Sequence, residues 1–143
     1  MNTKLYKQVH SLAGELLAAA EAGDDKQFHA LYLQLRTLCQ DNEADERKNH
    51  PVQWETLADF TEDAADALRL YEKALGIAES RQARDYMASI CYAMALLLFE
   101  EAAPVGNLER ARLVAQQASE YASRIEDDEL KSDIAALIKQ LSS

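Results

Sequence analysis

Apolar side chains recur along this chain at intervals of three and four residues, which is the spacing of one face of an α-helix. The first such segment covers residues 4–22 and ends at Gly23, where a left-handed helix cap is expected. A second segment follows directly after the acidic pair 24–25, which can cap its start. Because short turns join antiparallel neighbours, the pattern predicts a helical hairpin over about residues 4–40.

The next segment, residues 41–49, contains no large apolar side chain and carries six charges, so we expect an exposed loop there. Pro51 follows it, and proline is well tolerated at the first position of a helix. A second helical pattern begins near Thr61, which predicts a second hairpin over about residues 51–79.

The segment from 82 to 102 is apolar almost all round, so a helix formed there must be covered by other helices on most of its circumference. Together with the amphipathic stretch that follows it, this segment predicts a third hairpin over about residues 82–125. A last amphipathic stretch over 128–141 predicts a helix that closes the end of the array. The whole chain, 1–143, is therefore expected to form one all-α domain of about seven helices.

Composition agrees with this prediction, because 4 Gly and 2 Pro in 143 residues leave little turn chemistry for β-hairpins. Cys39 and Cys91 stand alone and far apart, so we expect buried free thiols and neither a disulfide nor a zinc site. The first eight residues lack the apolar core of a signal peptide, which indicates a cytoplasmic protein. The longest uncharged run, 86–99, is too short to span a bilayer.

Three segments at the start of the second helix of each pair share a pattern of small, acidic and apolar residues; they are 23–28, 62–67 and 106–111. They resemble the Gly-Asp-x-x-x-Ala turn of the tetratricopeptide repeat (TPR). Ala67, Tyr71 and Ala74 are similar in spacing to the signature of the second helix of that family, and Trp54 and Leu57 resemble the start of its first helix.

The resemblance implies that antiparallel hairpins stack into a right-handed superhelix. The distance from Phe28 to Ala67 is 39 residues and that from Ala67 to Ala111 is 44, whereas a regular repeat has about 34. The repeats are therefore degenerate. A closed helical bundle is the alternative arrangement.

Charge limits the partners. The chain carries 15 Lys and Arg against 25 Asp and Glu, a formal charge of −10, which repels the phosphates of nucleic acids and anionic membrane surfaces. This balance favours another protein, one with a basic segment, as the partner. The same acidic surplus also has a plain role in keeping a small protein soluble.

Residues that could carry catalysis are scattered. His10, His29 and His50 are spread along the chain and are not expected to share a metal, and no H-E-x-x-H, G-x-S-x-G or glycine-rich phosphate loop occurs. The acidic run 126–129 suits the positive N-terminal end of the last helix. We therefore expect no enzyme, no cofactor and no metal site.

The resemblance to the TPR family further implies that the first helix of each pair lines a concave groove of mixed apolar and acidic character. The residues placed there are His10 and Leu17, Glu55 and Asp59, and Leu96 and Glu100. A peptide or helix with Lys or Arg beside apolar anchors would suit such a groove. The alternative is that these carboxylates only solvate an exposed face.

Three functions remain open from the sequence. The first is an adaptor or regulator that binds a peptide or helix of another protein. The second is a dedicated chaperone or toxin-neutralising protein that forms a tight complex with a single client. The third is a structural homodimer in which the apolar helix near 82–102 is buried between two copies.

Overall fold

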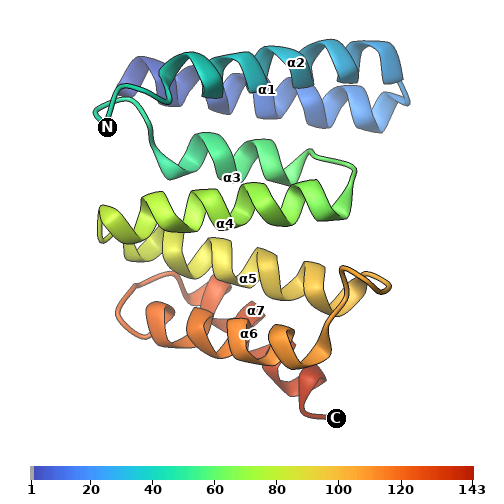
Figure 1. Cartoon of the computed structure of the whole chain (residues 1–143), viewed down its shortest axis with the longest axis vertical. Helices are drawn as coiled ribbons and strands as arrows, with labels where there is room; N and C mark the ends of the chain where they lie inside the picture. The colour runs from blue at the N-terminus through green and yellow to red at the C-terminus, as the bar shows by residue number, and fades with distance from the viewer. Residues whose placement is uncertain (1) are drawn as a thin grey trace.

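The computed structural model describes residues 2–143, and in this part of the chain seven α-helices and no strands are present (Figure 1). The prediction of an all-α fold with about seven helices is confirmed. None of the described helices is long and apolar enough to cross a membrane. The helices are α1 (Thr3–Ala22), α2 (Asp25–Asn42), α3 (Pro51–Asp59), α4 (Ala64–Ser80), α5 (Arg84–Glu100), α6 (Leu108–Ala122) and α7 (Asp128–Leu141).

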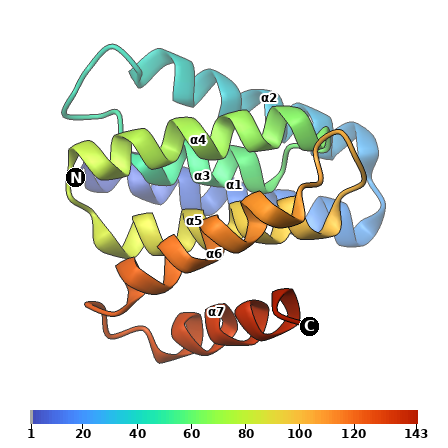
Figure 2. The ribbon, with the colours of Figure 1, turned by 60° about the horizontal axis from the view of Figure 1, so that its bottom comes forward.

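Neighbouring helices along the chain pack against each other throughout, from α1 on α2 to α6 on α7. The odd-numbered helices also contact one another in the order α1, α3, α5, α7, and α1, α3 and α5 run in the same direction (Figure 1). In both views α1 and α2 lie at one end of the array and α7 lies at the other (Figures 1 and 2). This order of contacts makes the exposed sides of α1, α3 and α5 into neighbouring surfaces.

The helix ends follow the capping residues expected from the sequence. Gly23 ends α1 in the left-handed conformation with φ of 67°, and Asp24 then accepts a hydrogen bond from the Gln27 backbone N–H at 3.1 Å. Asn107 caps α6 in the same way. By contrast, α5 begins two residues later than predicted, because Gln82 adopts a positive φ of 54° in the turn that precedes it.

Helix α5 lies at the centre of the packing. It contacts α3, α4, α6 and α7, which covers the apolar circumference that the sequence shows. Its buried side chains are Met87, Ala88, Ile90, Cys91, Met94, Ala95 and Leu98.

Small side chains on α4 and α6 permit close contact with α5. Ala74, Ala111 and Ala118 are fully buried and Ala67 is 3% exposed, so these two helices present their smallest residues to the interior. Trp54 is 4% exposed and fills wider space near α3. The expected roles of these small and large residues in the core agree with their burial.

The loop between α2 and α3 is better held than its charged sequence suggests. Its side chains are mostly exposed, but the Arg81 guanidinium donates hydrogen bonds to the backbone carbonyls of Glu46 and of Asn49, the latter at 2.6 Å. The Asn49 side chain also accepts a hydrogen bond from the Trp54 indole N–H at 2.7 Å, and Lys73 lies 4.0 Å from the centre of the Trp54 ring. The loop is therefore fastened to α3 and α4 through its backbone.

The turn between α5 and α6 is closed by close backbone contacts. The Gly106 N–H donates to the Ala102 carbonyl at 3.0 Å, and the Asn107 N–H donates to the Leu98 carbonyl at 2.8 Å. A Cβ atom added at Gly106 would lie 1.9 Å from the Glu101 carbonyl oxygen, which is far inside van der Waals contact. Only glycine fits this position without a shift of the backbone.

Gly106→Ala is expected to lower the free energy of unfolding by about 1–3 kcal/mol, because the turn must open to admit the methyl group. Gly76→Ala is the matched control. Gly76 lies exposed within α4 with open space around its Cα, so the same substitution should raise stability by about 0.5–1 kcal/mol. Chemical denaturation followed by circular dichroism measures both values. Equal effects of the two substitutions would contradict the tight contact.

Candidate functional site

The six residues predicted to line a groove lie on three neighbouring helices. They are His10 and Leu17 on α1, Glu55 and Asp59 on α3, and Leu96 and Glu100 on α5. We call the solvent-facing side of α1, α3 and α5 that carries them the inner face. Nothing in the structure contradicts this placement, and it remains a prediction that a partner binds there.

The α1 part of the inner face is exposed and partly apolar. Leu17 is 54% exposed and Tyr6 is 41% exposed, which makes them two of the four most exposed large apolar residues in the described chain. The His10 ring is also exposed and stacks on the Tyr6 ring with centroids 6.4 Å apart. On α5, Leu96 is half-buried whereas Glu100 is exposed.

Glu55 has a role inside the fold that the sequence does not reveal. Its carboxylate accepts a hydrogen bond from the Ser89 hydroxyl of α5 at 2.7 Å, which links α3 to α5. Burial raises the pKa of Glu55 from 4.5 to about 7, and the nearby Asp59 carboxylate adds to the rise, although the Ser89 hydrogen bond opposes it.

Asp59 is tied to the fold in a similar way. The buried Tyr71 hydroxyl of α4 donates a hydrogen bond to the Asp59 carboxylate at 2.5 Å. Burial raises the pKa of Asp59 despite this bond, and burial together with the Asp59 carboxylate raises the pKa of Tyr71. Two of the four helix pairs that involve α3 are thus joined by carboxylates that were predicted to face a partner.

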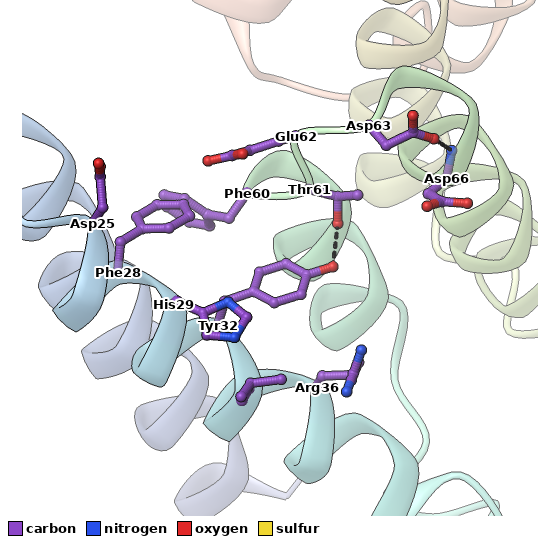
Figure 3. A pocket seen from close by; sticks show the side chains of 11 residues that line it. Asp25, Phe28, His29, Tyr32, Arg36, Phe60, Thr61, Glu62, Asp63 and Asp66 are labelled. Carbon is purple, nitrogen blue, oxygen red and sulfur yellow. Dashed lines mark hydrogen bonds between the residues drawn. The ribbon is translucent and has the colours of Figure 1, made fainter.

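A second hollow lies on a different part of the surface, between α2 and the turn that joins α3 to α4 (Figure 3). We call it the α2 groove. Its volume is about 560 Å³. It is lined by Asp25, Phe28, His29, Tyr32, Leu33, Arg36, Phe60, Thr61, Glu62, Asp63 and Asp66.

Aromatic contacts and one hydrogen-bond chain form the wall of the α2 groove. The Phe28 and Phe60 rings meet edge to face with centroids 6.2 Å apart. The Thr61 hydroxyl donates to the Leu57 carbonyl at 2.7 Å and lies 2.7 Å from the Tyr32 hydroxyl. Because a threonine hydroxyl has one proton, Tyr32 is the donor in the second bond. These contacts connect α2 to the end of α3 (Figure 3).

The α2 groove was not predicted, and its origin is the length of α3. Helix α2 has 18 residues whereas α3 has nine, which correspond to about 27 Å and about 14 Å. The shorter helix leaves part of α2 uncovered on this side. The sequence carried one signal for it, since the chain from Trp54 to Ala67 is short for the TPR pattern, but that signal does not say which side chains face the gap.

Metal and thiol chemistry find little support in the described residues. No group of three or more His, Cys, Asp or Glu side chains is close enough there to hold a metal ion. Cys39 and Cys91 are buried free thiols, as expected, and burial raises the pKa of each to about 12. The Cys39 thiol instead donates a hydrogen bond to the Gln53 carbonyl at 3.3 Å. A thiol with so high a pKa is a poor nucleophile at neutral pH.

Comparisons with protein families, with curated proteins and with solved structures found no match to this chain. A functional proposal therefore depends on the geometry and charge of the chain itself.

Glu55→Gln is expected to change how stability depends on pH. Because the pKa of Glu55 is raised on folding, its contribution is favourable below pH 4.5 and is lost as pH rises through about 7. Glutamine keeps an oxygen for the Ser89 hydroxyl but cannot ionise, so the variant should gain about 1–2 kcal/mol over the natural protein between pH 4 and pH 8. The full shift is not expected, because Glu55 is partly exposed.

The control for this measurement is Glu120→Gln on the exposed side of α6. Urea unfolding at a series of pH values compares both variants with the natural protein. A Glu55→Gln stability curve that runs parallel to that of Glu120→Gln would show that Glu55 is not desolvated.

Proposed function

We propose that this protein is a protein-interaction module that binds a peptide or helix of a partner protein and catalyses no reaction. The observation that carries the proposal is the α2 groove, a hollow of about 560 Å³ that combines three aromatic rings with four carboxylates. Aromatic side chains supply much of the binding energy at protein interfaces, and charge on the rim steers the partner. The groove thus has the acidic and apolar character expected from the sequence, at a place different from the inner face.

We further propose that the helix pairs are degenerate TPR-like repeats. Two features support this: successive pairs contact in chain order, and the odd-numbered helices also contact one another along the array. The buried alanines Ala67, Ala74, Ala111 and Ala118 occupy the positions at which the family places small residues. The inner face then corresponds to the concave surface of such an array, and it is the rival site in the experiment below.

The partner expected for the α2 groove is a protein segment with Lys or Arg beside an apolar anchor. The formal charge of −10 and the carboxylates of the groove favour a basic segment over nucleic acid or an anionic membrane. The proposal places this interaction in the cytoplasm, where the two buried free thiols would stay reduced. A dedicated client of a chaperone or of a toxin-neutralising protein would show itself as a tight complex of fixed stoichiometry.

A homodimer is the second candidate, now for a different reason. Helix α5, whose apolar surface suggested self-association, is covered by four helices of its own chain. Helix α6, however, leaves Leu108 50% exposed and Leu113 66% exposed, and Leu113 borders a hollow between α4 and α6. A dimer would have to use this surface. Leu113→Lys should abolish such a dimer in sedimentation experiments and leave a monomer unchanged.

The test of the module is affinity capture from a lysate of the source organism with three variants of the full chain. The groove variant Asp25→Lys/Glu62→Lys is expected to recover at least about tenfold less partner than the natural protein, because it reverses the charge of the groove. The inner-face variant Leu17→Ser/Glu100→Lys and the control Glu120→Lys should recover it in full. Circular dichroism confirms that each variant is folded.

Loss of the partner only in the inner-face variant would show that the α2 groove is the wrong site. Full recovery with every variant would contradict both surfaces. When a partner has been recovered, calorimetry with the purified pair gives its stoichiometry, which distinguishes an adaptor with several partners from a protein with one dedicated client.

A further inference from the structure

The α2 groove has two ends of different chemistry. At one end lie Asp25, the Phe28–Phe60 ring pair and Glu62, and at the other lies Arg36 (Figure 3). Asp25 and Arg36 are eleven residues apart on the same helix, which places them about 16 Å apart along its axis. A ligand group at the acidic end is therefore well separated from the positive charge of Arg36.

Two of the four carboxylates of the groove are free to meet a ligand. Asp63 caps α4 by accepting a hydrogen bond from the Asp66 backbone N–H at 3.0 Å, and Asp66 pairs with Arg69. Asp25 and Glu62 have no side-chain hydrogen bond or ion pair within residues 2–143. These two unpaired carboxylates lie at the end that carries the aromatic rings (Figure 3).

The aromatic rings there are positioned to contact a cation. The side chains of Phe28, Tyr32 and Phe60 are each only half-buried, so part of their aromatic surface borders the hollow. Aromatic faces attract ammonium and guanidinium groups, and the attraction adds to that of a nearby carboxylate. The apolar stem of a lysine or arginine would meanwhile cover the exposed carbon of the rings.

We propose that the acidic end of the α2 groove binds a cationic side chain, arginine or lysine, of the partner, with its stem on Phe28 and Phe60 and its charge near Asp25 and Glu62. This inference rests on the proposed function and gives the groove its specificity. A metal ion is the less suitable occupant, because no group of three His, Cys, Asp or Glu side chains gathers in the described chain, whereas calcium takes six or more oxygen ligands.

The test is an NMR titration of the full chain with four short capped peptides that differ at one central residue. The residues compared are arginine with its neutral isostere citrulline, and lysine with norleucine. We expect the charged peptides to shift the signals of Phe28, Tyr32, Phe60 and Glu62 and to bind about three to ten times more tightly than their neutral counterparts. Added salt should reduce this preference.

Two matched variants assign the preference to the groove. Glu62→Gln removes one charge from a residue that is neither in a helix nor a helix cap, and it should remove most of the preference for the charged peptides. Glu120→Gln, an equal change on the exposed side of α6, should leave the preference intact. Phe28→Leu keeps an apolar side chain and should weaken binding of the arginine peptide more than that of the citrulline peptide.

Failure of this inference can be told from failure of the module itself. Equal shifts at the groove with charged and neutral peptides would overturn the selection of a cation and leave peptide binding at the groove standing. Shifts that appear only on the inner face, at Leu17 and Leu96, would overturn both. A preference for cations that survives Glu62→Gln would show that the charge is recognised elsewhere, which also overturns the inference.

Discussion

The burial of α5 is the constraint on which the rest of the fold depends. A helix of 17 residues that is apolar around most of its circumference cannot face water, and here it contacts α3, α4, α6 and α7. Four helices can approach one helix closely only if some of them present small side chains. The alanines of α4 and α6 meet this need, so those helices spend their apolar positions on close contact with the interior.

The short helix α3 is the second constraint, and it creates the hollow on the surface. Helix α2 extends beyond the nine residues of α3, and without support its half-buried rings would face water. The edge-to-face contact of Phe28 with Phe60 and the hydrogen bond from Tyr32 to Thr61 hold α2 at the end of α3. The gap is thereby kept open at a fixed width, which is what a preformed binding site requires.

Local signals in the sequence were sufficient for the helices and most of their ends. Gly23, Pro51 and Asn107 act through the backbone of their immediate neighbours, so their roles can be predicted without the fold. The bonds of Glu55 to Ser89 and of Asp59 to Tyr71 depend on how α3 is rotated against two other helices. No spacing in the sequence contains that rotation.

The same limit explains the α2 groove and the loop before α3. The aromatic contact joins residues 32 positions apart, and the bonds of Arg81 to the loop carbonyls join residues at least 32 positions apart. The loop was expected to be merely solvated because its side chains are charged. Its backbone carbonyls, which the side-chain pattern does not describe, are what fasten it to the fold.

The carboxylates of this acidic chain differ in what a partner would have to displace. Glu55 and Asp59 already accept hydrogen bonds from Ser89 and Tyr71, so a partner that used them would have to share or break bonds between helices. Asp25 and Glu62 have no such bonds, and a cation could reach them without disturbing the fold. Exposed ion pairs alone are weak and salt-sensitive. The aromatic rings beside these two carboxylates are therefore the feature that gives the α2 groove an advantage over the inner face.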